Sequence, residues 1–169
     1  MKIYFSNVIV KSSKSIDLLK ELIMSGTETV TVSETEGGKF TNHIITNSGH
    51  TLIADEPKDL GGDDLGPNPY DFLLSALGAC KSMTMRMYAT HKRFNLDHVE
   101  VKLTHRKIHA KDCGNCETEK GMVDIIDTEI TISGDLSDVE REKIFAIAEK
   151  CPVHRTIMNE VVINSNLTT

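Results

Sequence analysis

The sequence of 169 residues has no tryptophan, few aromatic residues (5%) and only five arginines. It also has no apolar run approaching the roughly 18 residues that a membrane-spanning helix needs, because its densest apolar stretch, 70–80, contains Asp71 and Ser75. A membrane span is therefore not expected. The net charge of −6 and the lack of clustered lysines and arginines argue against a protein that binds the phosphate backbone of nucleic acid.

The amino end lacks the features of a secretion signal, since its short apolar stretch is interrupted by polar residues and no small-residue cleavage pattern follows. We therefore predict a cytoplasmic protein. Its four cysteines, Cys80, Cys113, Cys116 and Cys151, are expected to be reduced thiols, because disulfide frameworks belong to small secreted chains. With 39% hydrophobic and 26% charged residues, the length predicts one domain with one core.

The pattern of apolar residues divides the chain into an amino-terminal extension, 1–26, and a single domain, 27–169. The extension is predicted as a strand or arm followed by a short helix. Strands are predicted at 27–32, 40–46, 51–54, 99–104, 127–133 and 160–164. A helix is predicted from Ser137, whose capping box is completed by Glu140, to about residue 150, and a short helix follows Cys151 and Pro152.

The most apolar segment predicts one long helix from Pro69 to about Arg93, with Asn68 as its N-cap. Its first half is apolar nearly all the way round. Such a helix must lie centrally or be covered by a partner chain, which predicts a homodimer. The second half is amphipathic, and Lys81, Arg86, Lys92 and Arg93 are predicted to face outward.

Two motifs in this order are the most specific feature of the chain: GPNPYDFLLSALGAC at 66–80 and CPVHRT at 151–156. Over residues 28–164 the chain resembles the OsmC/Ohr family, most closely its OsmC-like branch with a Cys-Pro-Val-His signature. The resemblance implies an α+β fold, with antiparallel sheets packed around a long central helix, in an intertwined homodimer. It also implies a thiol-dependent peroxidase without a cofactor. The resemblance implies that Cys80 reduces an organic hydroperoxide and that Cys151 resolves the oxidised Cys80. A thiol or dithiol reductant would then restore both thiols.

The residues around Cys80 bear on that chemistry, because a peroxidatic cysteine reacts as a thiolate and its sulfenic acid is rescued by a second thiol. The neighbours at helical spacing are mostly apolar, among them Ala76, Leu77 and Met83. This wall suits a hydrophobic peroxide, but desolvation raises the pKa of a thiol, so a cation or hydrogen-bond donor must come from elsewhere. Cys151 is better placed, since as an N-cap it faces unpaired N–H groups.

The supporting residues of the family are only partly matched. Its peroxidases place an arginine in the amino-terminal β region and a glutamate ten residues before the peroxidatic cysteine. Here the first arginine is Arg86, and the position ten before Cys80 is Tyr70, followed by Asp71. The candidate supporting residues are therefore Tyr70, Asp71, Arg155 and His154, with Lys39 as a further cation. Asp71 is alternatively a helix N-terminal carboxylate, and His154 a polar first-turn residue.

This departure keeps a second function open, a non-catalytic protein of the same fold that responds to redox state or binds a small hydrophobic ligand. A third concerns Cys113 and Cys116, whose C-x-x-C spacing fits an exposed hairpin tip, a redox-active dithiol or a weak zinc site. His105 and His109 on one strand would lie about 13 Å apart, too far to share that metal. Because the motif connects two strands, we predict that it is not part of the Cys80 site.

Overall fold

The described part of the chain comprises residues 27–114 and 116–168 of a computed structural model, and the predicted extension of residues 1–26 lies outside it. The strands are β1 Val30–Glu34, β2 Asn42–Thr46, β3 Thr51–Ala54, β4 Asn95–His109 and β5 Met122–Asp135. The α-helices are α2 Pro69–Lys92, α3 Asp138–Ala148 and α4 Pro152–Met158, and two short 3₁₀ turns cover Lys58–Leu60 and Ala110–Asp112. This order confirms the predicted α+β class.

Strands β1, β2 and β3 form an antiparallel meander in the order of the sequence. Its turns contain Gly37 and Gly49, both with positive φ, a conformation that glycine adopts without steric cost. The predicted strand 51–54 is confirmed, and the other two begin two or three residues later than predicted. Apolar side chains of this sheet remain 38–58% exposed, namely Val30, Val32, Ile45, Leu52 and Ile53.

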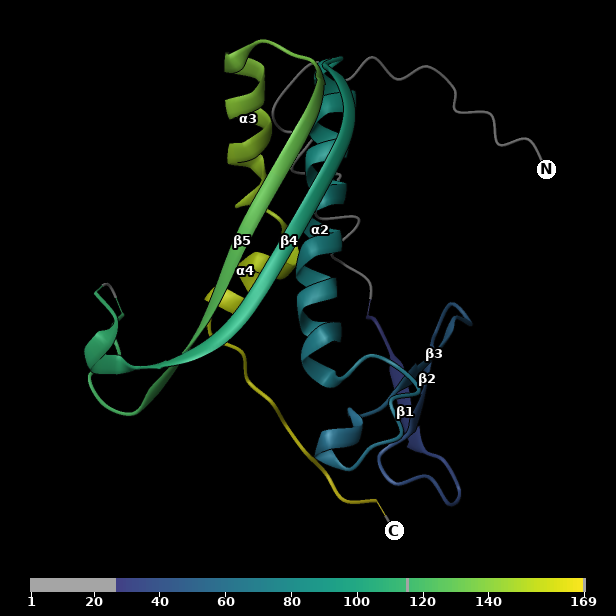
Figure 1. Cartoon of the computed structure of the whole chain (residues 1–169). Helices are drawn as coiled ribbons and strands as arrows, with labels where there is room; N and C mark the ends of the chain where they lie inside the picture. The colour runs from purple at the N-terminus through teal and green to yellow at the C-terminus, as the bar shows by residue number, and fades with distance from the viewer. Residues whose placement is uncertain (1–26, 115, 169) are drawn as a thin grey trace, which may run out of the picture.

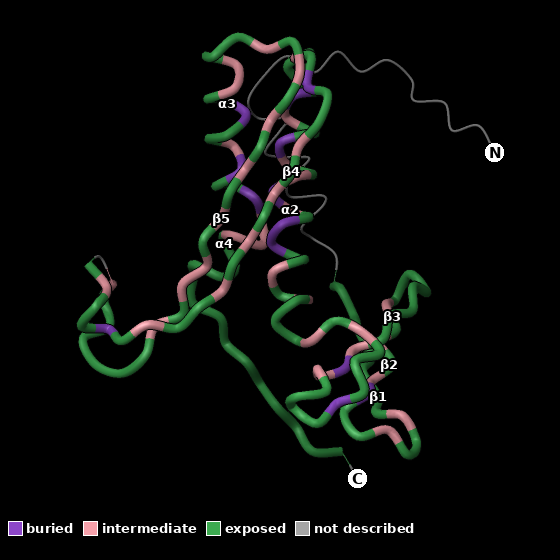
Figure 2. Tube along the Cα trace, in the orientation of Figure 1, coloured by how far each residue is buried: buried purple, intermediate pink, exposed green. Residues whose placement is uncertain are grey.

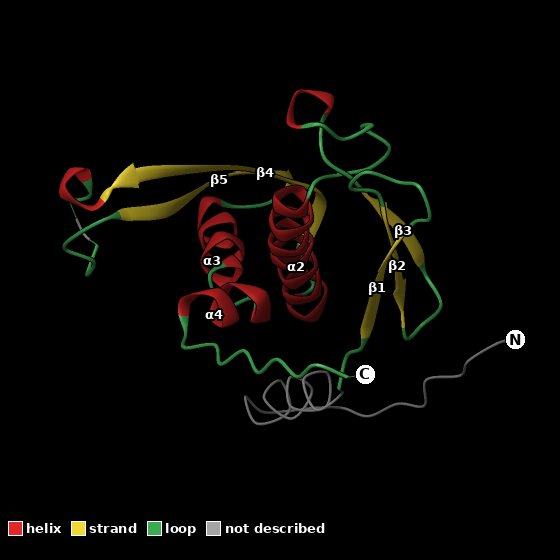
Figure 3. Cartoon of the chain, turned by 90° about the horizontal axis from the view of Figure 1, so that it is seen from below, coloured by secondary structure: helices red, strands yellow, loops and turns green. Residues whose placement is uncertain are grey.

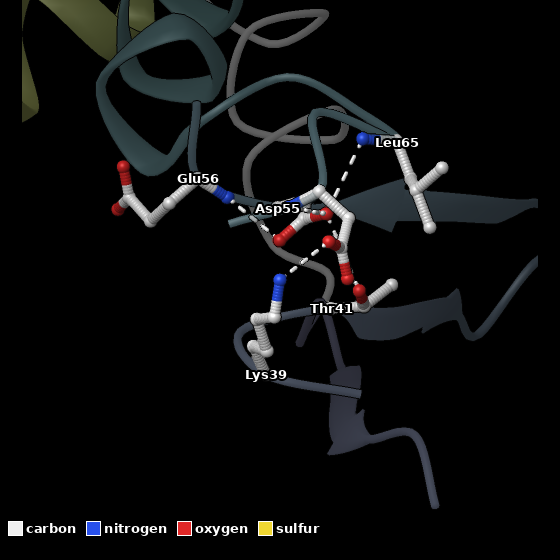
Figure 4. A network of polar contacts seen from close by, with 6 residues as sticks. Lys39, Thr41, Asp55, Glu56 and Leu65 are labelled. Carbon is white, nitrogen blue, oxygen red and sulfur yellow. Dashed lines mark hydrogen bonds and ion pairs between the residues drawn. The ribbon is translucent and has the colours of Figure 1, made fainter. Parts of the chain in front are cut away.

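The loop after β3 is organised by Asp55, a carboxylate only 2% exposed (Figure 4). It accepts hydrogen bonds from the backbone N–H groups of Glu56, Asp63 and Leu65 and from the Thr41 hydroxyl. Burial alone would raise the pKa of Asp55, but these four donors together lower it. An ion pair between Lys39 and Asp63, 2.8 Å long, closes the same loop from outside. The loop therefore leads to α2 in a fixed path.

Helix α2 begins and ends as the sequence predicts. The Asn68 side chain accepts from the Asp71 N–H at 3.0 Å and the Asp71 carboxylate accepts from the Asn68 N–H at 3.0 Å, a complete capping box. Arg93 ends the helix in the left-handed conformation, with φ of 60°. The long helix predicted at 69–93 is confirmed.

Strands β4 and β5 form a long hairpin that crosses one side of α2 and α3, while the β1–β3 sheet lies beside α2, on the flank away from α3 (Figure 3). Buried residues gather where α2 faces α3 (Figure 2). This core consists of Met85, Ala89, Leu96, Ile144 and Ala148. The Ser137–Glu140 capping box of α3 is confirmed. The far end of the hairpin projects away from the helices (Figure 1).

Two predictions about the fold are wrong. Residues 160–164 form no strand in the described structure, and they pair with none of its five strands. Lys81, predicted to face outward, is buried. The buried stripe of α2 consists of Leu77, Lys81, Met85 and Ala89, four residues apart, and it leaves Met83 and Met87 more than half exposed.

Candidate functional site

Cys151 is placed by the start of α4. It is the N-cap of that helix, Pro152 occupies the first turn, where its missing N–H costs nothing, and the Cys151 sulfur accepts a hydrogen bond from the His154 N–H at 3.3 Å. The side chain is completely buried and carries a free thiol. The predicted N-cap position is confirmed.

Several groups act on the Cys151 thiol in opposite directions. Burial raises its pKa most, and the His154 N–H partly offsets this. The neighbouring Cys80 side chain raises the pKa further, and the positive charge of Lys81 lowers it. The net effect is a pKa above the ordinary value of 9.0, so Cys151 is protonated at neutral pH.

Cys80 lies on α2 and meets Cys151 where α2 packs against α4. It is half-buried and also a free thiol. Two cysteines that stand 71 positions apart in the sequence are thus brought together by helix packing. One thiol is protonated and enclosed, and the other is the more accessible of the two. A sulfenic acid formed on Cys80 would have a thiol beside it.

Lys81 is the site residue that the sequence interpretation missed. Its side chain is 2% exposed, and its Nζ lies 2.7 Å from Glu149 Oε1 at the end of α3. The other oxygen of Glu149 faces His154 Nδ1 at 3.6 Å. The sequence contained a signal for the burial of Lys81, because this residue stands midway between Leu77 and Met85 on one helical stripe. Its charge, however, suggested a solvent-facing position.

Most of the predicted supporting residues have partners away from the thiols or are exposed. Asp71 closes the capping box of α2, and Tyr70 stacks on His105 with ring centroids 4.5 Å apart. Ten residues of helix place Tyr70 about 15 Å along the axis from Cys80. Arg155 is exposed on α4, and Lys39 pairs with Asp63. Of the candidate supports, only His154 belongs to the thiol site.

Three of the other arginines are also engaged away from the thiols. Arg86 donates to the backbone carbonyls of Leu96 and Asp97, Arg106 pairs with Asp127, and Arg141 donates to the backbone of β5. Within the residues that the structure describes, Lys81 is thus the cation whose charge acts on the Cys151 thiol.

A groove of about 480 Å³ runs between α2 and β4. Leu74, Gly78, Val101 and Leu103 line it together with Asp71, Ser75, Ala79 and Ser82. Gly78 permits this close approach of helix and strand, since a Cβ there would lie 2.8 Å from the Leu103 side chain. Cys80 is not among the lining residues, so the groove lies on a different side of α2 from the thiol.

Cys113 and Cys116 form a disulfide in the connection between β4 and β5, beyond the last strand pair, His109 with Met122. This differs from the expectation that all four cysteines are thiols, because a two-residue spacing holds the sulfurs together. His105 bonds Asp124 at 2.7 Å and is not directed at the motif. Among residues 27–114 and 116–168, no group of three potential metal ligands is found.

Taken together, the fold and the site define a class of protein, an α+β chain in which a long helix and the start of a later helix present two free thiols to each other. The chain belongs to the OsmC-like protein family, whose model matches residues 61–166. The Cys-Pro-Val-His branch stays a prediction. The comparison with curated proteins gives no match.

Solved structures share the fold. An OsmC-like protein from Mycoplasma pneumoniae is 22% identical over 80% of this chain and 89% of that one, with a TM-score of 0.60. An organic hydroperoxide resistance protein, OsmC, from Legionella pneumophila is 24% identical over 78% and 89%, with a TM-score of 0.57. The organic hydroperoxide resistance protein OhrB of Bacillus subtilis is 16% identical over 78% and 90%, with a TM-score of 0.53.

Proposed function

We propose that this protein reduces organic hydroperoxides through Cys80 and Cys151. The observation that carries the proposal is the pairing of two free thiols with unequal surroundings, one half-buried on α2 and one enclosed and protonated at the start of α4. Two of the structures that share the fold are organic hydroperoxide resistance proteins, which agrees with the proposal.

The proposed reaction has three steps. The Cys80 thiolate attacks the outer oxygen of ROOH, the O–O bond breaks, and the alkoxide leaves as ROH after taking a proton, which leaves Cys80 as a sulfenic acid. The Cys151 thiol then attacks the Cys80 sulfur, forming the disulfide and releasing water. Two equivalents of a thiol, or one dithiol, finally reduce the disulfide and return both thiols.

We further propose that the working unit is a homodimer in the cytoplasm. The β1–β3 sheet leaves its apolar side chains exposed, and Met83, Met87 and Phe145 on the helices are 51–64% exposed. A second copy of the chain would cover this surface. A cytoplasmic reductant pool would keep Cys80 and Cys151 reduced. The described residues contain no helix long and apolar enough to cross a bilayer.

A specific observation favours one alternative. The groove between α2 and β4 has partly apolar walls and lies apart from Cys80, as a binding site for a small hydrophobic ligand would if the protein were not catalytic. In that case the thiol pair would report redox state rather than turn over substrate.

The test is treatment of the reduced protein with an organic hydroperoxide such as cumene hydroperoxide, followed by peptide mass mapping. A Cys80–Cys151 disulfide, stoichiometric release of the alcohol and no reaction in Cys80→Ser would support the proposal. Cys80 left unmodified under peroxide excess, in protein that is folded and reduced, would overturn it in favour of the ligand-binding alternative.

A further inference from the structure

The burial of Lys81 is a costly feature that packing does not explain. An ammonium removed from water loses hydration, and replacing a buried ion pair by apolar residues is often neutral or stabilising. Its neighbours on the stripe, Leu77 and Met85, show that an apolar side chain fits this face of α2. The lysine is thus held in a position where a leucine or methionine would serve the fold at least as well.

What Lys81 faces is the thiol site. It follows Cys80 directly in α2, its charge acts on the Cys151 thiol, and its Nζ is bound by Glu149 at 2.7 Å. The charged and titratable groups at this point are Cys80 and Lys81 from α2, Glu149 from the end of α3, and Cys151 and His154 from α4. A thiolate forming here meets one buried cation.

We propose that Lys81, held by Glu149, is the cation that favours the thiolate form of this cysteine pair and so sets the pH at which Cys80 reacts. The inference rests on the proposed function, because it concerns the same two thiols. A cation within a few ångströms favours the charged form of a thiol, and low solvent exposure strengthens this effect, since water does not screen it. Lys81 needs no movement to act, because it is already anchored.

Glu149 is the residue that positions Lys81, and its own charge has an effect of definite sign on the thiolate. Its carboxylate is half exposed, so water solvates it while it holds the lysine from one side. As an anion near the thiols it also disfavours a second negative charge. Removal of its charge with Lys81 retained should therefore make the thiolate more favourable, whereas removal of the Lys81 charge should make it less favourable. A merely structural ion pair would not produce opposite shifts.

The test measures alkylation of Cys80 by iodoacetamide as a function of pH in the full-length reduced protein, with Cys151 followed separately by peptide mass. Lys81→Met should move the midpoint to higher pH and slow alkylation at neutral pH, by about tenfold for each unit of the move. Lys81→Arg should restore the wild-type profile, and Glu149→Gln should move the midpoint down. The matched control is Lys150→Met, because Lys150 adjoins Cys151 in sequence but is exposed.

A Lys81→Met profile that coincides with those of wild type and Lys150→Met would overturn the inference. If Lys81→Met fails to fold, as judged by circular dichroism, Glu149→Gln tests the inference in its place. A shift of the Glu149→Gln midpoint to lower pH would support the inference, and a Glu149→Gln profile equal to that of wild type would overturn it. Because alkylation uses no peroxide, a shifted profile in a protein that does not reduce hydroperoxides would contradict the proposed function and leave this inference standing.

Discussion

The two cysteine pairs of this chain differ in almost every physical respect. Cys80 and Cys151 are separated by 71 positions, are free thiols, and meet where helices pack. Cys113 and Cys116 are three positions apart, are bonded to each other, and lie at the end of a hairpin away from the helices. The contact of the first pair exists only in the folded chain, whereas a single short loop brings the second pair together.

This difference has a chemical consequence. Around the first pair the fold controls solvent, charge and access, so that one thiol is enclosed and a buried lysine lies nearby. Around the second pair both residues are half-buried in an irregular segment with no comparable enclosure. Reactivity tuned by the fold is therefore expected at the first pair, and ordinary thiol–disulfide exchange at the second.

The largest expected effect comes from Cys151→Ser. Without the resolving thiol, Cys80 sulfenic acid has no partner, so consumption of hydroperoxide should stop after about one equivalent per chain. Intact-mass measurement should find one added oxygen on Cys80 and, with excess peroxide, two or three. Continued turnover in this variant, supported by Cys113 or Cys116, would remove the functional distinction between the two pairs.

Stability should separate the same two regions. Ile144 is completely buried beside Met85, so Ile144→Ala should lower the free energy of unfolding by about 2–5 kcal/mol, measured by urea titration. Met122, at the end of the hairpin, is 50% exposed. Met122→Ala should change the free energy of unfolding by about 0.5 kcal/mol or less, as surface substitutions usually do. Equal losses would mean that the hairpin end is as well packed as the core.

A smaller effect concerns pH. The pKa of Cys151 is raised in the folded state, chiefly by burial, so the folded chain keeps a proton that the unfolded chain loses at lower pH. Its contribution to stability is complete below the unfolded thiol pKa and is lost as the pH rises through the folded value. Urea titrations above pH 9 should thus show a steeper loss of stability in wild type than in Cys151→Ala. Parallel curves would contradict this assignment.

Much of this organisation follows from local sequence signals. Asn68 and Pro69 fix the start of α2, Ser137 and Glu140 fix the start of α3, and β-branched runs mark the meander. The predictions made from these signals are confirmed because helix caps and turns depend on residues that are neighbours in the sequence.

Long-range features could not be predicted in the same way. The burial of Lys81 depends on Glu149, which stands 68 positions later, and no periodicity reveals that partner. Strands β4 and β5 extend well beyond the segments 99–104 and 127–133, in which apolar and polar residues alternate. They do so because the backbone hydrogen bonds between the two strands continue to the end of the hairpin. The segment 160–164 has strand-forming residues but pairs with none of the described strands, so propensity alone misled the prediction.

The smallest expected effect is that of Cys113→Ser combined with Cys116→Ser. The disulfide closes a very short loop, so it removes little freedom from the unfolded chain. In the folded chain the strand ladder, which ends at His109 and Met122, already holds the two arms together. Loss of the disulfide should therefore change the free energy of unfolding little. Effects at well-separated sites add with little coupling, so the Cys80 alkylation rate of the double variant should stay within about twofold of wild type. Alkylation kinetics and urea titration on the same samples measure both quantities. A large fall in the Cys80 rate with the fold intact would mean that the hairpin end reaches the thiol site, for instance across a dimer, and the two pairs would then form one redox system.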